Sequence, residues 1–164
     1  MADLERFRVA QENPRAGFAT ALAELPAGRK TSHWIWYVFP QLAELGRSSM
    51  ARRFGLADMD EAMAYLWDPV LGARLTEAVV AVRAHVAGSR PIPIETLMGS
   101  HIDALKLVSC LTLFRHVART PAGGEPRPAW EALGADADAI LAAARLQGLP
   151  PCAFTEEACR AGTR

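Results

Sequence analysis

Apolar residues recur along this chain at the spacing of an α-helix. Phe18, Leu22 and Leu25 stand at positions i, i+4 and i+7, which lie on one face of a helix. Between residues 70 and 82 a longer series of leucines and valines repeats at the same spacing. The alternation of apolar and polar residues that marks a half-buried strand does not recur. The pattern therefore predicts an all-α protein.

The segment HIDALKLVSCLTLFRHVA, residues 101–118, is the most apolar long stretch. Its apolar residues would cover most of the circumference of a helix, which is typical of a helix buried among others. A strand over KLVSCLTLF is an alternative, because that run is short and rich in apolar residues. The capping residues on both sides favour a helix, and we predict that it is the central one.

Capping residues divide the chain into about seven or eight helices around this central helix. Asp58 followed by Glu61, and Ser100 followed by Asp103, match the capping-box pattern of a helix start. Prolines and glycines mark the ends. The predicted helices run from Asp3 to about Glu12, from Asn13 to about Gly28, from Thr31 or Ser32 to before Pro40, from Ser48 or Ser49, from Asp58, from Asp68 to Gly88, from Ser100 to about residue 118, and from Asp136 to Gln147.

The length of 164 residues fits one compact multihelical domain. We predict a helical core over residues 3–118. Residues 119–164 are expected to pack on the same domain as a loop, an Ala-rich helix and a tail. The segment Thr120–Pro128 is a loop by composition, and the tail after Gly148 contains little that predicts order beyond one turn.

Charge and hydropathy exclude several classes of partner. Eighteen basic and eighteen acidic side chains cancel, so the chain has no net field for gathering nucleic acid, although a local basic patch stays open. No apolar run reaches the roughly 18 residues of a membrane helix. The charged N-terminus lacks a signal-peptide core. We therefore expect a cytoplasmic protein without a membrane partner.

The three cysteines, Cys110, Cys152 and Cys159, form no CxxC pair. A zinc site would need a fourth ligand and closer spacing, and His85 and His116 stand apart from any second histidine at metal-binding spacing. We expect reduced structural thiols, no metal and no cofactor.

The first candidate site is GRKTSHWIWYVFPQ, residues 28–41. Arg29 and Lys30 come just before a predicted helix start, where free amides and partial positive charge favour an anion. Ser32 adds a hydroxyl donor, and His33 follows.

Two tryptophans accompany this anion site. Trp34 and Trp36 are two residues apart and cannot share a helix face, so one is expected in the core and the other beside a pocket. A flat ring near an anion site suits a nucleotide or a sugar phosphate. In the alternative interpretation both rings are core residues, the cations are solvated and the hydroxyls only cap a helix.

The second candidate site is MGSHIDALKLVS, residues 98–109. Asp103, Lys106 and Ser109 fall on one row of the predicted central helix. Polar groups on a buried helix need partners, because an unpaired one costs several kcal/mol. The alternative is an ordinary capping box with one salt bridge.

A third candidate, GRSSMARR, contains Arg47 and Ser48 and could form a second anion-binding rim. A solvated helix face is the alternative account.

Four stretches carry a resemblance to a known family. DLERFRVAQ, ALAELPAGRKTSHWIWYVFPQL with the ELGRSSMARRF that follows, EAMAYLWDPVLGARL and MGSHIDALKLVSCLTLF together resemble the bacterial family of domain of unknown function 1810, often mislabelled calpastatin. The resemblance covers about Asp3 to Phe114 and implies a compact multihelical domain, without implying a reaction. The matching motif residues are Lys30, Ser32, His33, Trp34, Trp36, Phe39, Pro40, Gln41, Gly46, Ser48, Asp103, Lys106 and Ser109. The motifs also look loosely like those of small helical glycosidases that act on ADP-ribose-type compounds, an analogy that does not warrant function.

Two classes of function stay open from the sequence. One is an enzyme or binder of a small phosphorylated ligand, with Asp103, Lys106 and His33 as catalytic residues and Glu44 as an alternative acid or base. Its predicted ligand contacts are Arg29, Lys30, Ser32, Trp34, Trp36, Gln41, Arg47, Ser48 and Ser109. The other is a non-catalytic interaction module with its surface around Trp34, Tyr37 and Arg47. As a further alternative, Asp103 bonds Lys30 or His33 as a buried structural pair.

Overall fold

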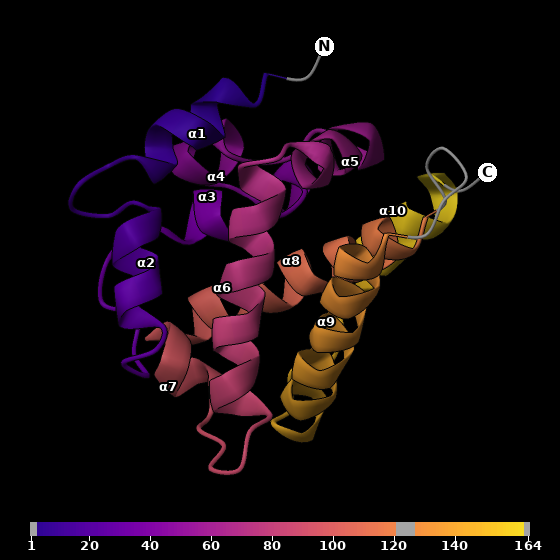
Figure 1. Ribbon diagram of the computed structural model, residues 1–164. Coiled ribbons are helices and arrows are strands. Elements are labelled where there is room, and N and C mark those ends of the chain that lie inside the picture. Colours follow the sequence, from indigo (N-terminus) through magenta and orange to yellow (C-terminus); the bar gives the residue numbers. More distant parts are fainter. Residues whose placement is uncertain (1–2, 121–126, 163–164) are drawn as a thin grey trace.

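The computed structural model describes residues 3–120 and 127–162. This part of the chain consists of helices joined by loops (Figure 1). It contains ten α-helices and one short 3-10 helix, η1, and its one β-bridge pairs Leu42 with Leu56. The prediction of an all-α domain is confirmed, with more helices than the seven or eight expected. The helices are α1 (Glu5–Gln11), α2 (Phe18–Glu24), α3 (Ile35–Val38), η1 (Ala43–Leu45), α4 (Ser49–Arg53), α5 (Met59–Trp67), α6 (Leu71–Val86), α7 (Ile94–Met98), α8 (His101–Arg119), α9 (Pro128–Leu146) and α10 (Ala153–Gly162).

Helix α8 is the central helix, as predicted. It packs against α9 along one side and also contacts α3, α5, α7 and α10. Ten of its residues, from Ala104 to Val117, are buried. The segment KLVSCLTLF lies inside this helix, so the alternative of a strand is wrong. Figure 1 shows α9 beside α8, and α6, which contacts α9, near the middle of the molecule.

Three of the predicted caps are present. The side chains of Ser48, Asp58 and Ser100 each accept a hydrogen bond from the backbone N–H three residues later. These bonds satisfy amides that a helix start leaves without an intrahelical partner. Asp3 does not cap α1, which starts at Glu5 after Leu4 without a side-chain cap. The caps therefore locate the starts of α4, α5 and α8 within the sequence.

The C-terminal part is more ordered than the sequence predicts. Helix α9 starts at Pro128, earlier than expected, with the proline in its first turn. The tail forms α10, which contacts α8 and buries Thr155 and Cys159. The expectation of a tail with little order is wrong, because Thr155 and Cys159 stand four residues apart on one helix face. Of the predicted loop Thr120–Pro128, residues 121–126 lie outside the described residues.

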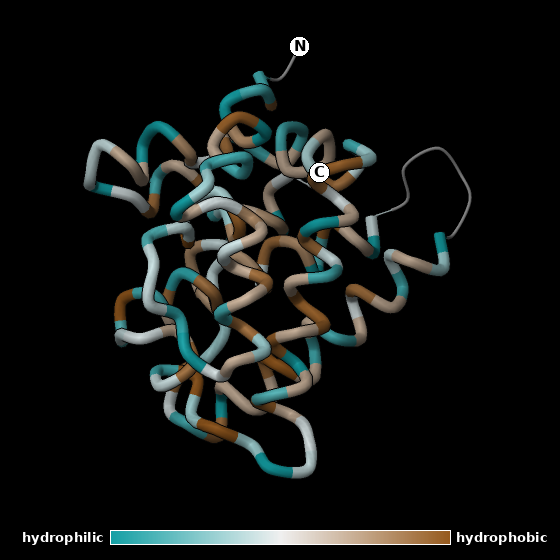
Figure 2. The backbone as a smooth tube through the Cα atoms, turned by 60° about the vertical axis from the view of Figure 1, so that its left-hand side comes forward, coloured by the Kyte–Doolittle hydropathy of each residue, from teal (hydrophilic) through white to brown (hydrophobic). Residues whose placement is uncertain are grey.

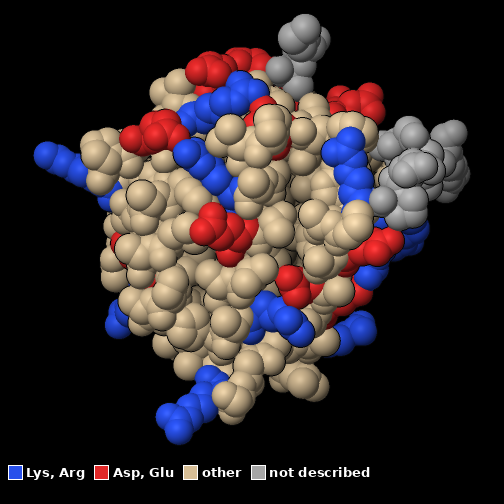
Figure 3. All heavy atoms as spheres, in the orientation of Figure 1, with Lys and Arg blue, Asp and Glu red and all other residues tan. Residues whose placement is uncertain are grey.

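Polar and apolar segments alternate along the helices (Figure 2). On the face seen in Figure 3, Lys and Arg side chains are interspersed with Asp and Glu, in keeping with the balanced composition. Over residues 3–120 and 127–162, no helix combines the length and the apolar character needed to cross a membrane.

Candidate functional site

Glu24, the last residue of α2, is the centre of a hydrogen-bond cluster in front of α3. Its carboxylate accepts hydrogen bonds from the backbone amides of Thr31 and Ser32, at 2.9 and 3.1 Å, and from both hydroxyl groups of these residues. A fifth bond comes from Nε1 of Trp34, at 2.7 Å. The cluster ties the end of α2 to the chain that leads into α3.

The charge of Glu24 is fixed by this cluster. Burial by itself raises the pKa of the carboxyl group, but hydrogen bonds from Ser32 and Thr31 outweigh burial and hold the pKa at about 2. The donors that the sequence assigns to a ligand phosphate, including the Ser32 hydroxyl, are therefore bonded to an anion of the protein itself. A ligand would have to displace Glu24 to use them.

Lys30, which the sequence predicts as a ligand contact, belongs to the interior. Its side chain is 5% exposed, and Nζ lies 2.7 Å from Oδ2 of Asp103. Nζ also lies 5.2 Å from the ring centre of Trp34, which is fully buried. The backbone N–H of Lys30 donates to the carbonyl of Leu97 at 2.7 Å. Because Trp34 is enclosed in this way, its ring offers no face for stacking on a ligand.

The turn between α7 and α8 brings Asp103 to Lys30. Gly99 ends α7 with φ +81°, and a Cβ at this position would lie 2.7 Å from the carbonyl oxygen of Lys30. Both the backbone conformation and the close approach therefore call for glycine. Ser100 follows and accepts a hydrogen bond from the N–H of Asp103 at 3.1 Å, which places Asp103 in the first turn of α8.

Asp103 lies between the only two lysines of the chain. Oδ2 pairs with Lys30, and Oδ1 lies 3.4 Å from Nζ of Lys106, whose side chain is 18% exposed. An ammonium group has three N–H donors. The ammonium of Lys106 makes one long contact with Asp103, so it keeps donors for a further acceptor.

Trp36 differs from Trp34 in the hydrogen bonding of its indole N–H. The ring is partly buried against the core, and Nζ of Lys106 lies 4.9 Å from the ring centre. Nε1 of Trp36 is buried, yet no residue that the structure describes accepts a hydrogen bond from it. The two tryptophans are thus a satisfied core residue and a partly exposed residue with a free donor.

A groove of about 350 Å³ runs beside Lys106. Two other predicted ligand residues, Gln41 and Ser109, line it, and the Ser109 hydroxyl donates to the carbonyl of Leu105 at 3.0 Å. We call this cavity the α8 groove. Its lining residues are Gln41, Leu45, Ile102, Leu105, Lys106, Val108, Ser109, Pro150 and Cys152.

Nine of the twelve predicted site residues do not line the α8 groove, among them Arg29, His33, Arg47 and Ser48. Arg29, His33 and Arg47 are exposed, and within the described part of the chain no hydrogen bond or ion pair joins His33 to Asp103. Ser48 caps α4 by accepting from the N–H of Ala51. The interaction surface predicted around Trp34, Tyr37 and Arg47 is not an exposed aromatic patch, because Trp34 and Tyr37 are both buried.

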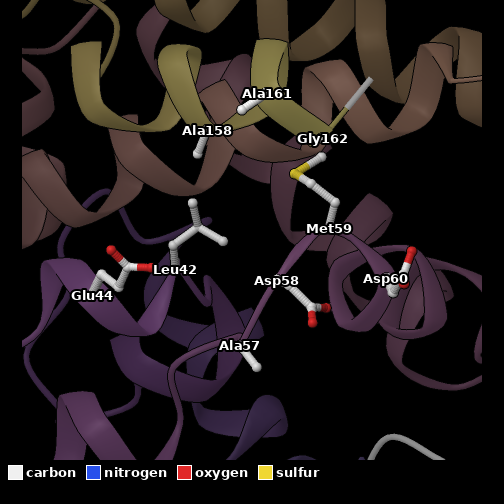
Figure 4. Close-up of a pocket in the computed structure, with 9 residues that line it drawn as sticks. All are labelled: Leu42, Glu44, Ala57, Asp58, Met59, Asp60, Ala158, Ala161 and Gly162. Carbon is white, nitrogen blue, oxygen red and sulfur yellow. The ribbon is translucent and has the colours of Figure 1, made fainter. Parts of the chain in front are cut away.

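A second cavity, of about 390 Å³, lies between α5 and α10 (Figure 4). Glu44, Asp58 and Asp60 line it, but in Figure 4 their carboxylates point to different sides. No group of three or more His, Cys, Asp and Glu among the described residues could hold a metal ion. Glu44, the alternative acid or base of the sequence analysis, lies here and not in the α8 groove.

The sequence analysis missed Glu24. No local pattern indicates it, because the groups that it binds come seven to ten residues later in the chain. A charged residue at the end of a short helix is expected to be solvated unless the following turn is known to fold back on it. Cys152 and Pro150 were missed as groove residues because little order was expected in the tail beyond one turn.

A family model matches most of this chain. The family model described as protein of unknown function (DUF1810) matches residues 1–124, which include Glu24, Lys30, Asp103 and Lys106. The chain is also similar to the crystal structure of the conserved hypothetical protein Rv1873 from Mycobacterium tuberculosis. The two share 37% sequence identity over 93% of each chain, with a TM-score of 0.73. None of the curated proteins matches this sequence.

Proposed function

The chain belongs to the family of proteins of unknown function DUF1810, and from this premise we propose that it binds a small phosphorylated ligand in the α8 groove. The ammonium of Lys106 carries this proposal. It borders the groove, and its one acidic partner, Asp103, lies 3.4 Å away and is more closely paired with Lys30. A phosphate oxygen would give Lys106 a short charge-assisted hydrogen bond.

The rest of the groove suits the organic part of such a ligand. Leu45, Leu105 and Val108 supply apolar surface, and Gln41 supplies a side-chain amide. The volume of about 350 Å³ is near the lower end of the roughly 300–1,000 Å³ usual for ligand pockets. We therefore expect a mononucleotide to fit more readily than a compound of the size of ADP-ribose.

Binding is better supported than catalysis. Both oxygens of Asp103 already contact an ammonium group, and Asp103 does not line the α8 groove, so neither oxygen is placed to act on a ligand there. His33, the third predicted catalytic residue, is exposed and is not joined to Asp103. Asp103 is accordingly proposed to orient Lys106 for the ligand.

Thermal unfolding in the presence of a ligand panel tests the proposal. The panel contains inorganic phosphate, the four ribonucleoside monophosphates and ADP-ribose, with adenosine as the compound that lacks phosphate. A ligand present at 100 times its dissociation constant stabilises the folded state by about 2.7 kcal/mol. We expect a monophosphate to raise the melting temperature and adenosine to raise it much less.

Two variants assign the effect to the groove. Lys106→Met removes the ammonium and should abolish the ligand-dependent rise. Arg52→Met removes an exposed cation on α4, outside the groove lining, and should keep it. Binding that persists in Lys106→Met, or a panel in which no phosphorylated compound stabilises the wild type, would exclude the α8 groove as a phosphate site.

An interaction module is the second candidate, favoured by two exposed apolar residues at the groove. Ile102 and Leu105 on α8 are 65% and 44% exposed. Apolar side chains gathered at one place on a surface are typical of protein contacts. If this function holds, Ile102→Asp with Leu105→Asp abolishes self-association or partner binding, and phosphorylated compounds leave it unchanged.

A further inference from the structure

Trp36 contains a polar group that the folded chain leaves unpaired. Its Nε1 is buried, and no described residue accepts its hydrogen. Most buried polar groups in proteins are hydrogen-bonded, and an unpaired one destabilises the folded state. An acceptor at this N–H would recover that free energy.

Trp34, two residues earlier, also lies beside a lysine, and its indole N–H has an acceptor. Nζ of Lys30 lies 5.2 Å from the Trp34 ring centre, and the indole N–H of Trp34 donates to the carboxylate of Glu24 at 2.7 Å. Nζ of Lys106 lies at a similar distance, 4.9 Å, from the Trp36 ring centre. Each tryptophan thus has its own lysine, but only Trp34 has a carboxylate oxygen on its N–H.

Among the described residues, Asp103 is the only carboxylate paired with Lys106, and it does not supply the missing acceptor. Asp103 reaches Lys106 at 3.4 Å and Lys30 at 2.7 Å, and no hydrogen bond joins it to Trp36 within the described residues. A lysine and an indole N–H that lie together, both with unused donors, form a recognition pair for an oxyanion.

We infer that Nε1 of Trp36 and Nζ of Lys106 together bind an oxyanion of the ligand, and that the Trp36 indole donates to it as the Trp34 indole donates to Glu24. This inference rests on the proposed function and names the contact by which a phosphoryl group is recognised. Because Nε1 is buried, the oxyanion reaches it only when a group beside the ring moves. Lys106 lies 4.9 Å from the ring centre and its side chain is 18% exposed, so its ammonium is the group proposed to move towards the oxyanion.

Trp36→Phe tests the contact, because it removes the N–H and keeps an aromatic ring beside Lys106. We expect the dissociation constant for AMP, measured by calorimetry, to rise at least tenfold. Trp130→Phe is the matched control, because Trp130 is partly buried, packs edge-on against Trp67 and does not line the groove. The affinity of this variant for AMP should stay within twofold of that of the wild type.

A second measurement does not depend on the folding of a variant. In wild-type protein with ¹⁵N-labelled tryptophan, AMP and inorganic phosphate should move the indole N–H resonance of Trp36 more than those of Trp34, Trp67 and Trp130. Acetate tests whether a carboxylate serves equally well. If acetate alone moves the resonance, the ligand is a carboxylate and a phosphoryl group is excluded.

The outcomes separate this inference from the proposed function. Wild type that binds no phosphorylated compound overturns both. Binding that needs Lys106 but is equal in Trp36→Phe, or that leaves the Trp36 resonance in place, overturns the Trp36 contact alone. In that case the indole N–H is satisfied by water or not at all.

Discussion

Nζ of Lys30 lies 2.7 Å from Oδ2 of Asp103 and thereby joins the segment before α3 to the first turn of α8. The two candidate segments of the sequence, GRKTSHWIWYVFPQ and MGSHIDALKLVS, meet at this ion pair. The pair is largely buried, with side chains 5% and 16% exposed, so it holds the site together and leaves Lys106 as the cation at its edge.

Asp103→Asn should destabilise the protein strongly. It leaves the buried ammonium of Lys30 without its anion, and breaking a buried pair in this way costs roughly 3–5 kcal/mol. Urea unfolding at pH 7 measures the loss. Glu5→Gln breaks the exposed pair with Arg8 and serves as a control, with an expected cost below about 1 kcal/mol. Equal effects in the two variants would show that the Lys30–Asp103 pair adds nothing beyond a surface contact.

Glu24→Gln should destabilise the protein by an amount that depends on pH. Hydrogen bonds to a charged group contribute roughly 1.5–3 kcal/mol each, and the variant weakens several of them. The carboxyl pKa is lowered from 4.5 to about 2, so its contribution is complete above pH 4.5 and is lost as the pH falls through about 2.

The difference in unfolding free energy between wild type and Glu24→Gln should therefore be constant from pH 7 to pH 5 and shrink towards pH 2. Glu77→Gln, at an exposed glutamate of α6, should show little difference at any pH. A difference that grows on acidification would have the wrong sign and would contradict the hydrogen-bonded carboxylate.

Gly99 and Gly148 allow the cost of a left-handed backbone to be separated from the cost of steric overlap with a neighbouring atom. Gly99 and Gly148 have nearly the same φ, +81° and +80°, but a Cβ at Gly148 would meet no atom within 4 Å. Gly148→Ala should cost roughly 1–2 kcal/mol for the left-handed backbone alone. Gly99→Ala should cost roughly 1–3 kcal/mol more, because the added methyl group overlaps the carbonyl of Lys30. Equal unfolding free energies for the two variants would contradict the close approach of the two turns.

Thiol labelling of the native protein should single out Cys152. Burial raises the pKa of Cys110 well above its usual value and that of Cys159 to about 11, so neither forms the reactive thiolate near neutral pH. Cys152 is partly exposed and lines the α8 groove. A disulfide reagent at pH 8 should modify one thiol rapidly, and Cys152→Ser should remove that phase. Three equal rates would show that the tail is not packed as described.

The residues that the sequence locates correctly act over short stretches of chain. Ser48, Asp58 and Ser100 cap the next turn of backbone, and the apolar circumference of residues 101–118 identifies the central helix without any knowledge of its neighbours. Such patterns depend on residues that are close together in the sequence, so they can be recognised without knowledge of the tertiary structure.

The features that the sequence could not provide depend on contacts between distant segments. Glu24 binds donors on a later turn, and the helix α10 buries Thr155 and Cys159 where it packs on the rest of the domain. Lys30 was predicted as a ligand contact because a cation before a helix suits an anion, but its anion is Asp103. The sequence offered this buried pair as an alternative, and the contact between the two distant segments decides in its favour.

A crystal structure of the protein grown with AMP tests the central claim most directly. We predict the phosphate in the α8 groove with an oxygen within about 3.2 Å of Nζ of Lys106, and Glu24 still bonded to Thr31, Ser32 and Trp34. A groove without ligand, or a phosphate at the Thr31–Ser32 turn with Glu24 displaced, would contradict the account.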